Sequence, residues 1–393
     1  MIQAGKRARS WARTMLLAGL AAATSVGALG AGAAQAHVGT AGGPRHIFYI
    51  MEENHAYDQI IGNTQDAPFI NELAAQNRLA ADFHGVTHPS LPNYLAAISG
   101  DFQRIFDDCA AGANITCAPE EFVPNSGDGT SATALTPAQA ATAASTPHLF
   151  PGKNIVDQLE AKGLSWKAYE ENLPSPGSEV VNAPVVNGTT VALYAQKHNP
   201  FMYFSDINYP GSPRLSKIVP FEGTFANDLR RGTVPNFSFI APNQCHDMHG
   251  ISPSQAALVN LPTCGYPDSG LDHGAIQLGD QWLAQTVAAI KHSAAWHDGT
   301  AEIIIAWDEN DYSVDTSGGP FSPIGANGAV LGGGPAPLIV VSNRGGHVVN
   351  DVPTDHYSTL YAIEKMWHLG CLANTCNFAN DHAFMNLFRV HGS

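Results

Sequence analysis

The sequence has few positive charges: its 393 residues include 19 Lys and Arg against 34 Asp and Glu, a formal net charge of -15. A protein whose main activity is binding to a nucleic-acid backbone or an anionic membrane surface needs a basic stripe, and this sequence has none. Nucleic acid is therefore excluded as the main partner. An anionic substrate would need local cations to overcome the acidic field of the chain.

Apolar runs long enough to cross a membrane are absent after residue 36. Residues 1–36 hold four Lys and Arg residues followed by an Ala-rich apolar run, which is typical of a secretory signal peptide. We therefore expect a cleaved segment and a secreted, extracellular protein with no transmembrane segment. Because the segment contains four basic and no acidic residues, its removal changes the net charge from -15 to -19.

Cysteine is also scarce, and all six cysteines lie beyond the predicted signal peptide. No two of them have the two-residue spacing of a zinc knuckle, so zinc ligation is the weaker alternative. About 15 connectivities are possible, but the oxidising compartment and the short separations favour three local disulfides. The expected pairs are Cys109 with Cys117, Cys245 with Cys264, and Cys371 with Cys376.

Strand and helix patterns alternate along the chain, which predicts an α/β protein. Apolar, β-branched runs predict strands at 47–51, 79–86, 164–170, 236–242, 301–307 and 336–342. Helical periodicity and end signals predict helices at 67–77, 90–99, 154–163, 191–199, 273–296 and 355–370. We expect one domain over 37–393, with an inserted loop near 125–146 where the residues are small, polar and interrupted by Pro.

Polar clusters follow the predicted strands at the points where they end. Ligands of open α/β sheets bind just beyond the carboxyl ends of strands, so these clusters predict a site. Carboxylates, an amide and imidazoles suit a divalent cation, and a serine that begins a helix would supply a nucleophile which the cation can activate. The members are Glu53 and Asn54, His88 and Ser90, Asp247 and His249, Asp308 and Glu309, and His356.

The helix after Ser90 offers a second reason for phosphate chemistry. We expect Ser90 to be its N-cap, with Pro92 in the first turn and Gly100 after the last residue. Free backbone N–H groups and the helix dipole at such an end favour a phosphate oxyanion. Simple capping by the serine is the structural alternative.

Six stretches together resemble the bacterial and fungal phosphoesterase family of secreted acid phosphatases and phospholipases C. The resemblance implies an alkaline-phosphatase-like fold, with a largely parallel central sheet and helices on both faces, a divalent metal and a covalent phosphoryl-enzyme step. The stretches are EENHAYDQIIGNTQDAPFINEL, VTHPSLPNYLAAISG, YAQKHNPFMYF, PNQCHDMHG, IIIAWDEND and DHYSTLYAIE.

The resemblance also implies a role for each matched residue. The metal ligands would be Glu53, Asn54, Asp247, Asp308 and Glu309. The catalytic residues would be Ser90 as nucleophile, with His249 and His356 acting on the leaving oxygen or the attacking water. We also expect the substrate to contact His88, Asn93, Lys197 and His198. The last two are predicted from their residue type, because a cation near a transferring phosphoryl group would help, and a helix-terminal lysine that interacts with the helix dipole is an equal alternative.

The expected function is therefore a secreted, metal-dependent acid phosphatase that hydrolyses phosphomonoesters through a phosphoserine at Ser90. Its substrate would be a small phosphorylated molecule or a phosphoinositide head group, and its metal Mg, Ca, Mn or Zn. A phosphodiesterase of the phospholipase C type is the alternative enzyme. A secreted protein that captures phosphate or a metal without turnover is the alternative class.

Overall fold

The computed structural model describes residues 43–120, 134–265, 271–311, 317–378 and 383–388. These ranges belong to one compact unit. The predicted signal peptide lies outside them, as do residues 125–133 of the predicted insertion; the rest of that insertion contains a short helix, α4 (Pro137–Ala143). No helix among the described residues has the length and apolar character to cross a bilayer.

The described residues form a central sheet of eight strands around β1, all seven residues of which are buried. Five of the seven strand pairings are parallel; β9 pairs antiparallel with both of its neighbours. The predicted largely parallel α/β sheet is thus confirmed. The spatial order is β10 (Val348–Asn350), β2 (Arg78–His84), β9 (Pro335–Ser342), β8 (Ala301–Trp307), β1 (His46–Glu52), β7 (Phe237–Ala241), β3 (Trp166–Glu170) and β6 (Ile218–Pro220).

Helices cover both faces of this sheet because successive side chains of each buried strand point in opposite directions. On β1, the Phe48 ring packs edge-on against Phe225 of α6 at 6.2 Å between centroids. The next ring, Tyr49, packs on Phe239, which contacts Tyr94 of α3 on the other face. Besides α4, the α-helices of the described residues are α1 (Tyr57–Ile60), α2 (Pro68–Gln76), α3 (Ser90–Ser99), α5 (Ile155–Ala161), α6 (Thr224–Arg231), α7 (Pro253–Leu258), α8 (His273–Lys291), α9 (Ala294–His297) and α10 (His356–Met366).

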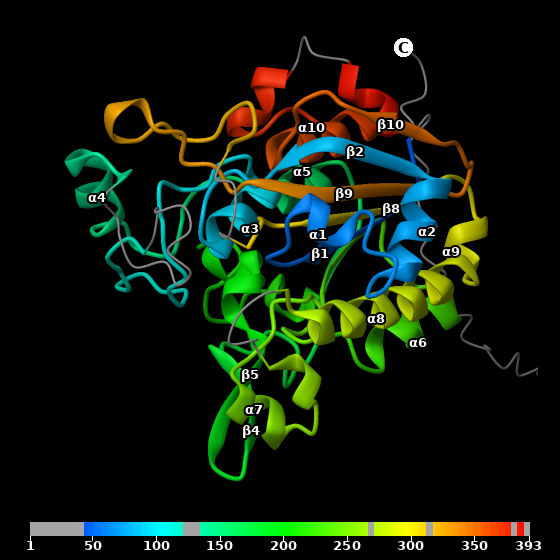
Figure 1. Cartoon of the computed structure of the whole chain (residues 1–393), viewed down its shortest axis with the longest axis horizontal. Coiled ribbons are helices and arrows are strands. Elements are labelled where there is room, and N and C mark those ends of the chain that lie inside the picture. Colours follow the sequence, from blue (N-terminus) through cyan, green and yellow to red (C-terminus); the bar gives the residue numbers. More distant parts are fainter. Residues whose placement is uncertain (1–42, 121–133, 266–270, 312–316, 379–382, 389–393) are drawn as a thin grey trace, which may run out of the picture. The chain divides into compact units, whose positions relative to one another are not determined.

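Side chains tie helices to one another within each layer. Asp280 of α8 accepts hydrogen bonds from the Ile70 and Phe69 N–H groups at 2.8 and 3.3 Å. These groups begin α2, whose N-cap, Ala67, has no side-chain acceptor, so a neighbouring helix supplies the cap. On the other face Gln158 of α5 donates to Glu364 of α10 at 3.0 Å. Figure 1 shows α1, α2 and α8 in front of the strands and α5 and α10 behind them.

The helix predicted at 191–199 is wrong. Those residues begin in strand β5 (Thr189–Ala195), which pairs antiparallel with β4 (Asn182–Val186) and runs into the 3-10 turn η2 (Gln196–His198). The turn between the strands is Asn187-Gly188, and both residues have positive φ, as a two-residue hairpin requires. The Asn-Gly pair is a sequence signal for a hairpin. In Figure 1 the hairpin lies beside α7.

Two further differences concern helix ends. α3 begins at Ser90 with Pro89 as its N-cap, so Ser90 is the first helical residue and its hydroxyl makes no cap hydrogen bond. The predicted helix at 273–296 is two helices, because Ser293 starts α9 by accepting a hydrogen bond from the Trp296 N–H. Gly100 ends α3 in the left-handed conformation at φ 72°, as predicted.

Candidate active site

Three adjacent parallel strands, β8, β1 and β7, bring the predicted polar clusters together at one edge of the sheet. Backbone hydrogen bonds continue beyond the strands: the Glu53 N–H donates to Asp247 O at 2.8 Å, and the Asp308 N–H to Glu52 O at 2.9 Å. Asn54 turns the chain with φ 53°. Sheet pairing therefore places Glu53, Asp247 and Asp308 side by side although they are far apart in the sequence.

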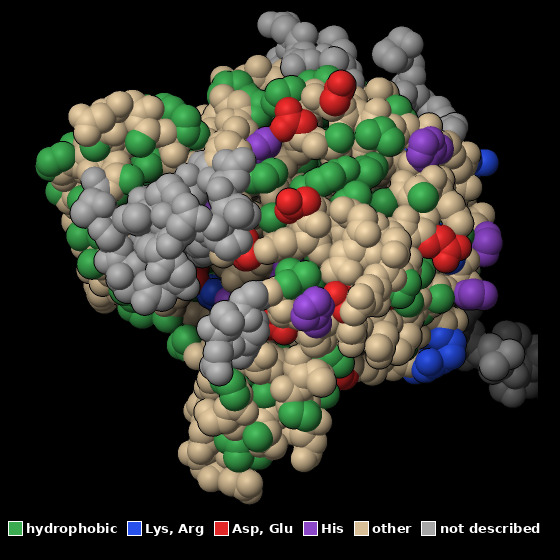
Figure 2. All heavy atoms as spheres, in the orientation of Figure 1, with side chains coloured by type: hydrophobic (Ala, Val, Ile, Leu, Met, Phe, Trp, Pro, Cys, Tyr) green, Lys and Arg blue, Asp and Glu red, His purple; other side chains and the backbone are tan. Residues whose placement is uncertain are grey.

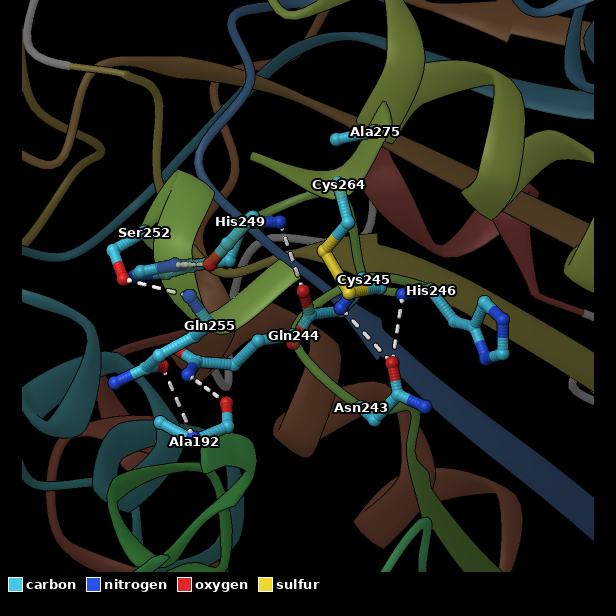
Figure 3. The surroundings of a disulfide bond; sticks show 12 residues. Ala192, Asn243, Gln244, Cys245, His246, His249, Ser252, Gln255, Cys264 and Ala275 are labelled. Atoms are coloured by element: carbon cyan, nitrogen blue, oxygen red, sulfur yellow. Dashed lines mark hydrogen bonds between the residues drawn. A yellow bond between two sulfur atoms is a disulfide. The ribbon is translucent and has the colours of Figure 1, made fainter. Parts of the chain in front are cut away.

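A disulfide anchors the loop that follows β7. Cys245 lies two residues before Asp247 and is bonded to Cys264. The side-chain oxygen of Asn243 accepts hydrogen bonds from the Cys245 and His246 N–H groups at 2.9 and 3.1 Å, as Figure 3 shows. The loop that carries Asp247 and His249 is thereby held by covalent and hydrogen bonds. All three predicted disulfides are present.

The Ser90 hydroxyl is directed at the carboxylate of Glu53. Its Oγ donates to Glu53 Oε2 at 2.9 Å, and the residue is only 1% exposed. The N-terminus of α3 was predicted to bind a phosphate oxyanion. The Asp108 carboxylate already occupies one of its N–H groups, because the Leu91 N–H donates to Asp108 Oδ1 at 2.9 Å. The hydroxyl itself is free of any capping role, which leaves it directed at the carboxylate.

His88 and Asn93 contact Glu309. Asn93 Nδ2 donates to Glu309 Oε2 at 3.0 Å, and His88 Nδ1 lies 2.8 Å from the same oxygen. Asn93 Oδ1 also accepts from the Val86 and Thr87 N–H groups at 2.8 and 3.2 Å. These contacts hold the loop before α3 against the end of β8.

His198 lies between two of the predicted metal ligands. Its Nε2 is 3.2 Å from Glu53 Oε1 and its Nδ1 is 3.2 Å from Asp247 Oδ2. Tyr94 stacks parallel on the imidazole at 5.1 Å between centroids. The sequence assigned His198 to substrate contact, whereas its side chain is only 3% exposed and is in contact with carboxylates.

Lys197, the residue before it, contacts two other segments. Its Nζ donates to Asp108 Oδ2 at 2.7 Å and lies 3.3 Å from His249 Nε2. His249 Nδ1 is 2.8 Å from Gly250 O, so this nitrogen carries the proton and Nε2 presents its lone pair. Lys197 lies in a 3-10 turn after β5 rather than at an α-helix end. Asp108 was not singled out in the sequence, where nothing but its position beside Cys109 marks it.

His356 is the first residue of α10 and is fully buried. Its Nε2 lies 2.7 Å from the Asp308 carbonyl oxygen, so Nε2 carries the proton. Its Nδ1 is buried and has no hydrogen-bond partner among the described residues. His356 therefore contacts the backbone of the metal-ligand candidate Asp308.

Burial shifts four carboxyl groups and four histidines of this cluster toward their neutral forms. It raises the pKa of Glu53 to about 7, and together with neighbouring carboxylates it raises the pKa values of Asp247, Asp308 and Glu309 well above their usual range. Burial also lowers the pKa values of four histidines: to about 3 for His88 and His249, to about 4 for His356, and well below the usual range for His198.

The donor set fits a divalent cation. Asn54 Oδ1 and Asp308 Oδ2 are buried oxygens that accept no hydrogen bond from the described part of the chain. Ligand atoms of Glu53, His198 and His249 lie within 4.8 Å of one another, close enough to share one ion. Several buried carboxylates side by side need a positive charge, and hard oxygen ligands with imidazoles suit Mg²⁺, Mn²⁺, Ca²⁺ or Zn²⁺. The structure thus adds His198 to the candidate ligands.

Residues 63–370 match the phosphoesterase family. The chain belongs to the phosphoesterase family. The resemblance seen in the sequence is confirmed, and the match covers Ser90, Asp247 and Asp308 but begins after Glu53 and Asn54.

The relatives of this phosphoesterase carry two kinds of name. A probable acid phosphatase of Kluyveromyces lactis is 27% identical over 331 residues, 83% of this chain and 59% of that protein. A phosphatidylinositol-3-phosphatase of Mycobacterium tuberculosis is 27% identical over 269 residues, 68% and 64% of the two chains. Phospholipase C A of that species is 26% identical over 235 residues, which are 54% of this chain and 38% of that protein. The chain thus spans less than two thirds of the length of these relatives.

Among solved structures, a protein of the alkaline phosphatase superfamily from Vibrio parahaemolyticus matches with a TM-score of 0.45 and 15% identity, over 85% of this chain and 68% of that one. The α/β assignment of this phosphoesterase rests on the sheet itself.

Proposed function

We propose that this protein is a secreted, metal-dependent phosphomonoesterase in which Ser90 accepts the phosphoryl group from the substrate. The observation that carries the proposal is the hydrogen bond from Ser90 Oγ to Glu53 Oε2, in a buried cluster of acidic and imidazole side chains. A serine that only capped α3 would direct its hydroxyl at the helix N–H groups. This hydroxyl is directed at the candidate metal ligands instead.

Each residue has a role that follows from its contacts. Glu53 orients the Ser90 hydroxyl for attack on phosphorus. The residues that would hold a cation are Glu53, Asn54, Asp247 and Asp308, with Glu309 and His198 beside them. A divalent cation bound there would lower the pKa of the hydroxyl and screen the charge of the phosphoryl oxygens.

Of the two histidines proposed to act on the leaving group or water, His249 is better placed. Its Nε2 lone pair faces Lys197 at 3.3 Å, and the residue is partly exposed. Burial and the neighbouring Lys197 lower the pKa of His249 to about 3 and keep the ring neutral. Its unprotonated Nε2 is the atom that would take a proton from the water that hydrolyses the phosphoserine. His356 is fully buried with one nitrogen bonded to the Asp308 carbonyl, which favours a role in holding that strand end.

The substrate class follows from charge. Lys197 is a cation whose charge acts on Glu53, the hydrogen-bond partner of the candidate nucleophile, and it would contact the phosphoryl oxygens of a small phosphomonoester. The relative named phosphatidylinositol-3-phosphatase makes a phosphoinositide head group one such substrate to test. Three disulfides support an oxidising, extracellular location.

A phosphodiesterase is the second candidate, because relatives named phospholipase C A match about half of the chain. Hydrolysis of p-nitrophenyl phosphate and of bis(p-nitrophenyl) phosphate separates the two. We expect the monoester to be the better substrate. Faster turnover of the diester would assign the protein to the second class.

The test of the proposal is p-nitrophenyl phosphate hydrolysis before chelation, after chelation, and after single divalent metals are added back. We expect activity to disappear with the metal and to return with one or more of the added ions. Hydrolysis that persists after complete metal removal would refute the metal dependence. Phosphate binding without any turnover would make the protein a binding protein instead.

A further inference from the structure

One carboxylate outside the predicted site contacts both the nucleophile helix and the site lysine. Asp108 Oδ1 accepts the Leu91 N–H at 2.9 Å, directly after Ser90, and its Oδ2 accepts from Lys197 Nζ at 2.7 Å. Both partners of the ion pair are mostly buried, with 18% and 17% of their side chains exposed. An ion pair with this little exposure is screened less by salt than a surface pair.

The Lys197 ammonium lies among charged and polar groups of the candidate site. Its Nζ lies 3.3 Å from the lone pair of His249 Nε2, and its charge acts on Glu53. A lysine stem is flexible, and the buried carboxylates that are the candidate metal ligands attract its ammonium. Asp108 counteracts this attraction with a negative charge 2.7 Å from the Lys197 Nζ.

We propose that Asp108 is a positioning residue that holds the Lys197 ammonium beside Ser90, where it binds the phosphoryl oxygens of the substrate. This inference rests on the proposed phosphomonoesterase function. Asp108 does not contact the reacting atoms. It acts through Lys197, and its second oxygen fixes the first turn of α3 at the residue after the nucleophile.

The neighbouring Asp107 provides a matched control. It lies in the same loop, two residues before Cys109 of the Cys109–Cys117 disulfide, and is fully buried. Its Oδ1 lies 2.7 Å from His148 Nε2 and accepts from the Cys109 N–H at 3.1 Å. Asp107 thus supports the loop through His148, whereas Asp108 contacts the site.

The experiment is a double-mutant cycle on the full-length protein with p-nitrophenyl phosphate. Asp108→Asn keeps an oxygen for the Leu91 N–H but removes the charge from Lys197. We expect kcat/KM to fall about ten- to hundredfold in the wild type and less than about threefold in a Lys197→Met background, since the two residues act as one unit. Inorganic phosphate should also inhibit Asp108→Asn more weakly than the wild type, by a similar factor.

Asp107→Asn is the control for the loss of a carboxylate from this loop. Asp107→Asn should lower the unfolding temperature but change kcat/KM by less than about threefold; if it fails to fold, the cycle with Lys197→Met still decides. Wild-type kinetics in Asp108→Asn, or effects of the two substitutions that multiply, would overturn the proposal. If the wild type does not hydrolyse phosphomonoesters, the proposed function fails, whereas an active wild type with Ser90→Ala inactive and Asp108→Asn unchanged refutes this inference alone.

Discussion

Ser90 is the residue on which the proposed chemistry depends. Replacement by Ala removes the hydroxyl and its hydrogen bond to Glu53 but leaves the helix backbone intact. We expect kcat to fall by roughly 10³ or more, while metal content and unfolding temperature stay close to wild type. Steady-state kinetics of the purified variant measures this.

Ser99, the last residue of the same helix, is the control for this substitution. It is buried, and its hydroxyl donates to the Leu95 carbonyl, so Ser99→Ala alters α3 without touching the site. Near-wild-type kcat is expected for it. If Ser90→Ala kept more than about a tenth of the wild-type activity, Ser90 would not be the nucleophile.

Replacement of Asp308 tests the assignment of the metal ligands. Its Oδ1 accepts the Asn54 and Glu309 N–H groups at 3.1 and 2.7 Å, while Oδ2 is the buried oxygen without a hydrogen bond. Asp308→Asn keeps the shape and loses the charge, so we expect metal affinity to fall more than stability. Metal analysis after dialysis, paired with activity, measures the effect; unchanged stoichiometry and activity would remove Asp308 from the site.

At the scale of elements, the sequence predicted strands better than it predicted the partners of side chains. Short, β-branched apolar runs such as Ile47–Met51 and 301–307 predict buried strands, and both predictions are confirmed. The segment at 191–199 begins as a strand rather than the predicted helix because Asn187-Gly188 closes a two-residue hairpin. The antiparallel direction of β9 and the contact of His198 with Glu53 depend on tertiary pairing that no local pattern specifies.

Helix α10 offers a pH test away from the site. Glu364 is buried, and burial raises its pKa to about 7 although Thr375, Gln158 and the Leu372 N–H donate to its carboxylate. Its contribution to stability is therefore fully present below the ordinary pKa of 4.5 and is lost as pH rises through about 7.

The corresponding variant is Glu364→Gln, which cannot ionise. Its stability relative to wild type should improve between pH 4 and pH 8 by on the order of 2–3 kcal/mol. Urea unfolding at both pH values measures this difference, and Glu72→Gln, at an exposed position on α2, controls for the loss of one negative charge. A difference between Glu364→Gln and wild type that does not change with pH would contradict the assignment.

At the scale of the whole molecule, the disulfides close loops of different length. The sequence separations are 5 residues for Cys371–Cys376, 8 for Cys109–Cys117 and 19 for Cys245–Cys264. Chain entropy predicts that removing the disulfide that closes the longest loop lowers the free energy of unfolding by about 1 kcal/mol more than removing the one that closes the shortest. Replacing each cysteine pair by Ala and measuring chemical unfolding tests this order. Removal of Cys245–Cys264 should also weaken metal binding, because this disulfide anchors the loop that carries Asp247.

The acidic composition of the chain agrees with the surface, where the face shown in Figure 2 carries few Lys and Arg side chains. The positions of the site clusters were predictable because the carboxyl ends of neighbouring strands meet. Asp108 was not predictable, because its contacts with Leu91 and Lys197 join three segments that only the folded chain brings together.

The central claim is a phosphoryl group carried by Ser90, and the most direct test is mass spectrometry of the Ser90 peptide after acid quenching during turnover of p-nitrophenyl phosphate. We predict phosphoserine at Ser90 in the wild type during the first turnovers and none in Ser90→Ala. A phosphoryl group on a different residue would contradict the account. So would an active enzyme whose Ser90 peptide stays unmodified at every quench time while Ser90→Ala still turns over.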